Sequence, residues 1–265
     1  MKHRRAPDQD FPWWLLLVAG VGLWLFWQIL ANDLYAQVLR TLVKGIGITL
    51  FVALVAYALA CLLGLGLALA GRSRWLVVRQ LARLYVELVR GIPIIVLLLY
   101  VAFVLAPALV LGWNALAEPL GLGLWKTRDF PLLWRAVIAL TLAYSAFIAE
   151  IFRAGLEAVD GGQVEAAEAL GLSGWQRFRH VVFPQAFRVV LPPLGNDFVA
   201  MVKDSSLVSV LGVTDITQLG KVTAAGNFRY FETYNVVALI YLVMTISLSL
   251  ALRRLERHLA GREGG

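Results

Sequence analysis

Residues 158–193 read AVDGGQVEAAEALGLSGWQRFRHVVFPQAFRVVLPP and lie between two apolar stretches of the chain. Strong helix formers fill positions 163–170. Gly171 follows them, and glycine readily adopts the left-handed conformation that ends many helices. Ser173 and Gln176 stand three positions apart, as in a capping box, and predict the start of a second helix. The pattern therefore predicts two short helices joined by a tight glycine corner.

Further residues refine this helix–glycine–helix unit. Asp160 is placed to cap the first helix. Trp175, Phe178 and Val182 follow at spacings of three and four, so they share one face of the second helix, which we expect Pro184 to end. Two interpretations are open on physical grounds alone. The unit is either a rigid protrusion on which another protein docks, or an amphipathic hairpin lying on a membrane surface.

The composition on either side of this unit indicates a membrane protein. Apolar residues make up 60% of the 265 positions and charged residues 15%, against about 45–50% and about 25% in soluble domains. A single cysteine, Cys61, excludes a disulfide framework and a cysteine-rich zinc site. The net charge of +7 suits basic residues gathered at the cytoplasmic ends of membrane spans, and we expect no nucleic-acid partner.

Membrane spans are predicted from the length of the apolar stretches, because a hydrocarbon core of about 30 Å needs roughly 20 residues of helix. Six stretches qualify: 12–30, 45–70, 84–111, 133–152, 186–212 and 234–252. The predicted fold class is thus an all-α integral membrane protein with six transmembrane helices. The cytoplasmic segment 154–185 is the one long connection between them.

The distribution of Lys and Arg predicts the orientation. With a cytoplasmic N-terminus, fifteen of the 24 basic residues lie inside and seven lie outside. Arg90 and Lys203 fall within spans. Because cytoplasmic loops carry the excess of basic residues, both termini are expected in the cytoplasm.

The helix–glycine–helix unit resembles a known motif. Glu165-Ala166-Ala167, then Gly171, then the sequence VVFP ending at Pro184, is similar to the EAA loop of the permease subunits of ATP-binding-cassette (ABC) importers. The resemblance implies that this loop forms a coupling helix seated in a cleft of an ATPase subunit, and it favours docking over the surface hairpin. It assigns ATPase coupling to these five positions.

The resemblance covers most of the chain. ELVRGIPIIVLLLY, AEIFRAGLEAVDGGQVEAAEALG and FPQAFRVVLPPLGNDFVAMVKDSSLVSV look like the polar-amino-acid branch of these permeases (histidine, glutamine and glutamate types). The resemblance implies a permease domain over 45–256, including the coupling segment 154–185. It leaves 1–40 as a cytoplasmic N-terminus with one helix added to a five-helix core, and 257–265 as a cytoplasmic tail.

The family also implies partners and a location. These are ABC ATPase subunits, a second permease subunit (a copy or a relative) and an external amino-acid-binding protein, in a bacterial cytoplasmic membrane. ATP and Mg²⁺ belong to the ATPase subunit, so no cofactor, metal or catalytic residue is assigned to this chain. The three histidines, at positions 3, 180 and 258, lie outside the predicted spans, which argues against an intramembrane enzyme.

Ionisable and polar groups inside spans are costly and therefore mark candidate transport paths. The candidates for contact with cargo are Arg90, Glu150, Asn196, Asp197, Lys203, Asp204 and Ser205. The alternative is packing. Glu150 with Arg153, and Glu87 with Arg90, have the spacing of local ion pairs, and Lys203 with Asp204 can pair with each other or with another span.

The sequence thus predicts the permease subunit of an ABC importer that carries amino acids, with polar or charged L-amino acids favoured. One alternative is the same architecture with another small solute, such as an oxyanion or opine. The other is a self-sufficient ion-coupled carrier, which is disfavoured because the two halves show no convincing repeat.

Overall fold

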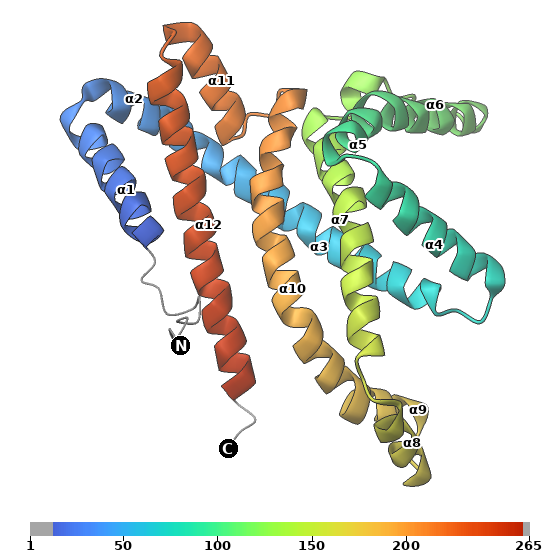
Figure 1. Cartoon of the computed structure of the whole chain (residues 1–265). Helices are drawn as coiled ribbons and strands as arrows, with labels where there is room; N and C mark the ends of the chain where they lie inside the picture. Colours follow the sequence, from blue (N-terminus) through green and yellow to red (C-terminus); the bar gives the residue numbers. More distant parts are fainter. Residues whose placement is uncertain (1–12, 262–265) are drawn as a thin grey trace, which may run out of the picture.

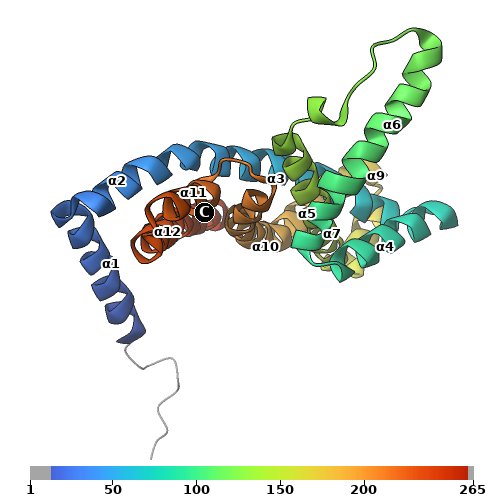
Figure 2. The same cartoon turned by 90° about the horizontal axis from the view of Figure 1, so that it is seen from above.

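The computed structural model describes residues 13–261, and every regular element in that range is helical. The α-helices splay apart around a central pair, α7 and α10 (Figures 1 and 2). Their bounds are α1 Trp13–Ala31, α2 Asp33–Leu42, α3 Ile46–Gly71, α4 Leu76–Gly91, α5 Ile94–Tyr100, α6 Ala106–Ala117, α7 Leu132–Glu157, α8 Gly161–Ala169, α9 Gly174–Arg177, α10 Phe183–Asp204, α11 Ile216–Asn227 and α12 Tyr230–Gly261.

Four helices in the described range are long and apolar enough to cross a membrane. They are Asp33–Gly71, in which α2 runs into α3, then Ile94–Leu120, Leu132–Glu157 and Tyr230–Arg257. α3 alone has 26 residues, about 39 Å at 1.5 Å per residue, which exceeds a hydrocarbon core of about 30 Å.

Two further helices occupy the other expected spans. α1 is apolar over 19 residues, although the expected start of that span, at position 12, lies outside the described residues. α10 stays helical through Pro192 and Pro193, although proline supplies no N–H for helical hydrogen bonding. Beyond Asp204 the chain tightens into a 3-10 helix, Ser205–Leu211.

The expected span over 84–111 is wrong in its boundaries. The helix breaks at Ile92 and Pro93, whose backbones are extended with ψ near 131° and 138°. A residue before proline is driven out of the helical region by the proline ring, so α4 ends at Gly91 and a new helix starts at Ile94. The apolar stretch that qualifies as a span is Ile94–Leu120, and α4 is a separate helix with both apolar and charged residues.

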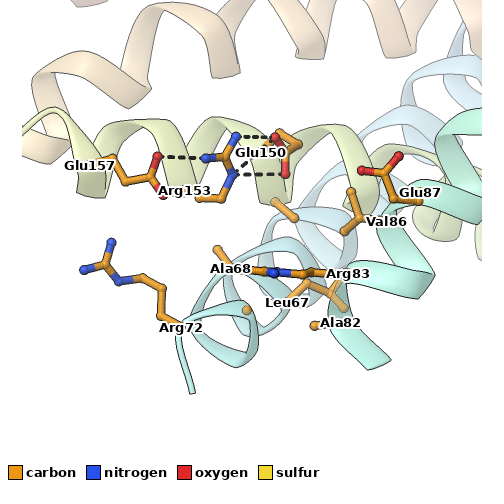
Figure 3. Close-up of a pocket in the computed structure, with 12 residues that line it drawn as sticks. Leu67, Ala68, Arg72, Ala82, Arg83, Val86, Glu87, Glu150, Arg153 and Glu157 are labelled. Atoms are coloured by element: carbon orange, nitrogen blue, oxygen red, sulfur yellow. Dashed lines mark hydrogen bonds and ion pairs between the residues drawn. The ribbon is translucent and has the colours of Figure 1, made fainter. Parts of the chain in front are cut away.

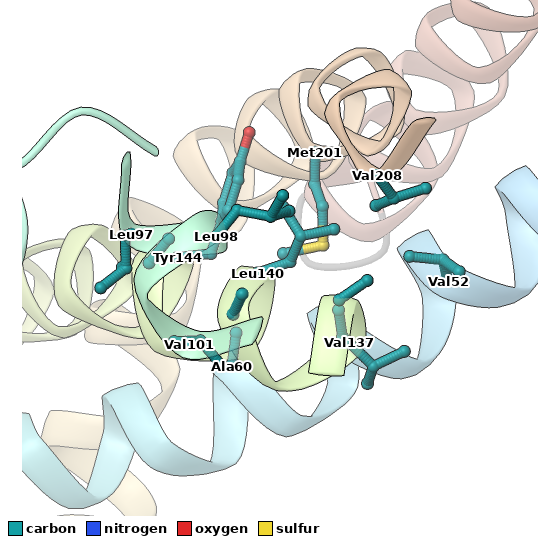
Figure 4. Packing of buried hydrophobic residues seen from close by; sticks show 14 of the residues in the cluster. Val52, Ala60, Leu97, Leu98, Val101, Val137, Leu140, Tyr144, Met201 and Val208 are labelled. Carbon is teal, nitrogen blue, oxygen red and sulfur yellow. The ribbon is translucent and has the colours of Figure 1, made fainter. Parts of the chain in front are cut away.

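The main core forms where α7 packs against α3, α5 and α10 (Figure 4). Leu98, Leu140 and Met201 are fully buried there. Small residues allow close approach, as in many membrane helix pairs. A Cβ on Gly64 of α3 would lie 3.0 Å from the Ser145 carbonyl oxygen on α7, so the two backbones touch at this point.

A second cluster joins the outer flank of the bundle. It buries residues of four helices together: Leu25 of α1, Val38 and Leu42 of α2, Ile216 of α11 and Val236 of α12. α1 therefore packs on the side of α2 and α12, away from α7 (Figure 2). At one end of the molecule α8 and α9 project beyond α7 and α10, while α11 lies at the opposite end (Figure 1).

Candidate functional site

α8 begins at a side-chain cap and ends at a left-handed glycine. The Asp160 Oδ1 atom accepts a hydrogen bond of 2.7 Å from the backbone N–H two residues on. Gly171 has φ of +79°; its N–H donates to the Glu168 carbonyl at 2.9 Å, and the Leu172 N–H donates to the Ala167 carbonyl at 3.1 Å. This pair of bonds satisfies carbonyl groups at the helix end. The predicted cap and corner are confirmed.

The second helix is locked to the first. Ser173 and Gln176 form the predicted capping box, each side chain bonding the other's backbone N–H at 2.9 and 3.4 Å. An Arg177 guanidinium nitrogen on α9 lies 2.5 Å from a Glu168 carboxylate oxygen on α8. α8 and α9 therefore form one stiff unit, because both their backbone corner and their side chains are fixed.

The coupling residues suggested by the sequence fall on two sides of α8. Glu165 and Ala166 are exposed, whereas Ala167 is buried. Leu170, at the tip beside Gly171, is 81% exposed, although leucine is usually covered. The unit thus presents small and apolar groups outward at the end of the molecule.

Pro184 does not end the second helix, as the sequence had suggested. The chain continues from α9 through a wider π-helical turn, Phe178–Val182, directly into α10. Proline lacks an N–H, and its ring crowds the carbonyl four residues back. The wider π-helical turn and the place of Pro184 in the first turn of α10 together accommodate the missing N–H and the ring. Gln185 then donates to Gln163 of α8 at 2.7 Å. α8 is consequently held to the start of α10 by this bond, while α9 runs into α10 without a break in the helix.

A charge network lies on the last turns of α7 (Figure 3), directly before the chain enters the helix–glycine–helix unit. Glu150 is paired with Arg153 at 2.6 Å, which confirms the predicted local pair, and Arg153 also holds Glu157 at 2.7 Å. Arg90 of α4 reaches Glu150 at 3.9 Å and lies over the Phe147 ring. The network therefore joins α4 to α7, two helices that are distant in the sequence.

The predicted Glu87–Arg90 pair does not form in the structure. Glu87 instead lines a cleft of about 400 Å³ between α3, α4 and α7. The cleft is lined by Leu67, Ala68, Gly71, Arg72, Ala82, Arg83, Val86, Glu87, Ala149, Glu150, Arg153 and Glu157. Of the residues singled out as candidates for a cargo path, it contains Glu150 alone.

The other candidates gather on α10, where their environments differ. The Tyr144 hydroxyl of α7 donates to Asp204 at 2.8 Å. Lys203 is exposed and does not pair with its neighbour. Ser205 is buried, and its hydroxyl donates to the Val202 carbonyl at 2.7 Å. Asp204 is thus held by Tyr144 while Lys203 is exposed, and Ser205 caps the C-terminal end of α10.

Asp197 carries an unpaired oxygen in the interior of the bundle. Its Oδ2 atom is buried and has no hydrogen-bond partner among the described residues. Nearby, the Tyr57 hydroxyl donates to the Leu194 carbonyl at 2.6 Å, and the Tyr57 ring packs 4.9 Å from that of Phe198. Asn196, next in the chain, is exposed. A buried acceptor without a donor is costly, so Asp197 is poised to accept from a cationic or N–H donor.

One polar cluster escaped prediction because its residues are distant in sequence. Asp215 is fully buried and accepts hydrogen bonds from the Gln218 backbone N–H at 2.7 Å and from the Tyr241 hydroxyl at 3.3 Å. Burial raises the pKa of the Asp215 carboxyl above its usual range. Asp215 directly before a helix was a readable N-cap signal, but its contact with α12 was not. The cluster fixes α11 against α12.

Comparison with known proteins decides the family. Residues 60–263 match the family described as "Binding-protein-dependent transport system inner membrane component". The chain belongs to this family. Its members' ABC importer permease fold accounts for the helical architecture.

Similar proteins share most of this permease's length. It is 38% identical over 217 residues to the probable amino-acid permease protein YxeN of Bacillus subtilis, covering 82% of this chain and 90% of that protein. It is 36% identical over 222 residues to the glutamine transport system permease protein GlnP of Escherichia coli K12, covering 82% and 92%. Such relatives are transport subunits, which points to a non-enzymatic membrane subunit.

Solved structures agree on the fold. The chain superposes on a crystal structure of an amino acid ABC transporter with histidines with a TM-score of 0.68 and 36% identity, covering 83% of this chain and 94% of that one. It also resembles the MetNI methionine ABC transporter in an inward-facing conformation, with a TM-score of 0.63, 20% identity, and coverage of 83% and 96%. The second likeness concerns the fold alone.

Proposed function

We propose that this permease carries polar or charged L-amino acids into the cell through a bacterial cytoplasmic membrane. The cargo assignment is supported by the named relatives, YxeN and GlnP, which are 38% and 36% identical. In this proposal an external amino-acid-binding protein delivers cargo, and separate ATPase subunits supply the energy. A second permease subunit, either a copy or a relative, completes the path.

The observation that carries the mechanism is the stiff connection from α8 to α10. The left-handed Gly171 and the Glu168–Arg177 pair fix α8 to α9, and unbroken helix leads from α9 into α10. When ATPase subunits close on the exposed face of α8, its displacement is transmitted to α10 without being absorbed by a flexible loop. Glu165, Ala166 and Gly171 form the docking surface, the buried Ala167 packs behind it, and Pro184 lies at the α10 junction.

The cargo path is proposed along α10 and the adjoining end of α7. An amino acid needs donors for its carboxylate and acceptors for its ammonium group. Asp197, with its unpaired Oδ2 atom, and Asp204, held by Tyr144, offer acceptors, while exposed Lys203 offers a cation. Asn196, Arg90 and Glu150 extend the polar surface; Ser205 supports the path by ending α10 rather than by touching cargo.

The proposed topology has six transmembrane helices with both termini in the cytoplasm. α1 and α10 join the four spans that meet the length and apolarity requirements. The excess of basic residues on the side of the α3–α4 corner and of the α8–α9 unit supports this orientation.

The test is uptake into proteoliposomes that contain this permease, its ATPase and its binding protein. Labelled glutamine, glutamate, histidine and arginine are offered with and without ATP. The proposal expects one or more of these to accumulate with ATP only. Uptake without ATP would replace the proposal with an ion-coupled carrier, and uptake of none of the amino acids would shift it to another small solute.

A further inference from the structure

A dense group of arginines marks the corner between α3 and α4. Residues 72–86 contain four arginines and no acid: Arg72, Arg74, Arg79 and Arg83. Arg72 and Arg83 line the cleft of about 400 Å³. In Figure 3, Arg83 runs from α4 toward α3 and Arg72 stands at the end of α3. Both arginines therefore line one opening, with their guanidinium groups apart from each other (Figure 3).

The charges that face this cleft are not balanced by pairing. Glu150 and Glu157 are both held by Arg153, at 2.6 and 2.7 Å. Arg72 and Arg83 make no hydrogen bond or ion pair through their side chains within residues 13–261, and Glu87 is the one acid of the cleft that is also unpaired. The lining itself carries three arginines and three glutamates, so the positive excess of this region comes from Arg74 and Arg79 on the corner beside the cleft.

Apolar surface continues outward from the cleft. The outer face of α4 carries four apolar side chains that are each more than half exposed: Val77, Leu81, Leu84 and Leu88. The apolar wall inside the cleft is formed by Leu67, Ala68, Ala82 and Val86. Trp75, at the corner, is 67% exposed, and tryptophan is enriched at the level of lipid headgroups. A ligand that fits this surface has an anionic head and hydrocarbon tails.

We propose that this cleft binds an anionic phospholipid of the cytoplasmic leaflet, with the phosphodiester held between Arg72 and Arg83 and the acyl chains along the outer face of α4. Guanidinium groups match phosphate oxygens with paired hydrogen bonds, and basic pockets between transmembrane helices on the cytoplasmic side favour such headgroups. The bound lipid would hold α4 against α7, the two helices that the Arg90–Glu150 pair joins. α7 is also the helix that leads into α8. The inference rests on the orientation given under the proposed function.

The experiment is native mass spectrometry of the detergent-solubilised permease–ATPase complex titrated with dioleoylphosphatidylglycerol or dioleoylphosphatidylcholine. The wild type is expected to bind phosphatidylglycerol on the order of 10- to 30-fold more tightly than phosphatidylcholine, because two interfacial arginines attract the anionic headgroup. R72Q/R83Q should lose that preference, while R253Q/R254Q, which removes two arginines of α12 outside the cleft, should keep it. R72K/R83K retains charge without the planar fork and should be intermediate.

Two results would overturn the lipid site. Equal affinity of R72Q/R83Q and R253Q/R254Q for phosphatidylglycerol would remove the cleft from the interaction. Displacement of the lipid by an equal concentration of glycerol 3-phosphate would make it a simple anion site. The orientation is tested separately by labelling Arg74→Cys in a Cys61→Ser chain with a membrane-impermeant thiol reagent: labelling from the outer side contradicts the orientation, whatever lipid is bound.

Discussion

The Tyr144 hydroxyl on α7 donates a hydrogen bond of 2.8 Å to the Asp204 carboxylate at the end of α10. Tyr144 is 4% exposed, and the two residues are 60 positions apart. The bond therefore joins the two central helices near the region that we propose as the cargo path. Asp204 is thus a structural partner of Tyr144 as well as the acceptor for cargo that we propose.

Tyr144→Phe is expected to destabilise the permease, because it leaves a partly buried carboxylate without its donor. Loss of such a bond costs on the order of 1–3 kcal/mol, which should lower the midpoint of thermal unfolding in detergent. Tyr100→Phe is the matched control, since Tyr100 is 55% exposed. Identical midpoints for both variants would show that the Asp204 bond contributes nothing.

Gly64→Ala should weaken the packing of α3 on α7. The added Cβ would lie 2.8 Å from an Ile148 methyl group and 3.1 Å from the Ala149 backbone nitrogen, and overpacking typically costs about 1–3 kcal/mol. Gly66→Ala, two positions on in the same helix, meets nothing within 4 Å and should be neutral or slightly stabilising. Chemical unfolding of both variants measures the difference, and equal stabilities would contradict the close contact.

Glu150→Gln separates a path role from a structural one. The ion pairs of Glu150 are partly exposed, with about a third of its side chain accessible, and such pairs contribute roughly 0–1 kcal/mol. We expect little change in thermal stability but a several-fold drop in uptake if Glu150 contacts cargo. Glu157→Gln removes the other partner of Arg153 and should leave uptake intact. Equal uptake by the two variants would return Glu150 to a packing role.

Asp215 predicts a pH dependence of stability. Because burial raises its pKa in the folded state, the folded protein holds the proton more tightly than the unfolded one. Its contribution is complete below the unfolded pKa of about 3.9 and declines as the pH rises from there through the raised folded pKa. Thermal unfolding between pH 4 and 8 should therefore show a downward slope that is reduced in Asp215→Asn; an unchanged slope would exclude Asp215 as its source.

Local rules predicted the features that depend on neighbouring residues. The Asp160 cap, the left-handed Gly171 and the Ser173–Gln176 capping box all involve partners within four positions, and all three were confirmed. The break at Pro93 was readable as well, because proline restricts the residue before it, but the uninterrupted apolar sequence beyond it favoured a single span.

Features that depend on the fold were beyond sequence reasoning. Arg90 has the spacing to pair with Glu87 in its own helix, which was the alternative to a role in the cargo path, yet it reaches Glu150 on α7 at 3.9 Å. The Tyr144–Asp204 bond and the Asp215 cluster likewise join distant helices. Pro184 was expected to end a helix, since the sequence gives no sign of the π-helical turn that precedes it. The roles proposed for the cargo-path residues stay predictions.

The most direct test of the account compares two left-handed glycines in ATP-driven amino-acid uptake. Gly171 has φ of +79° and Gly121, in the loop after α6, has φ of +65°, and neither has an atom within 4 Å of an added Cβ. Valine strains both positions by roughly 1–2 kcal/mol, but only Gly171 sets the angle between α8 and α9. We predict that Gly171→Val loses both copurification with the ATPase and uptake, while Gly121→Val retains both. Uptake by Gly171→Val at the wild-type rate would contradict coupling through α8.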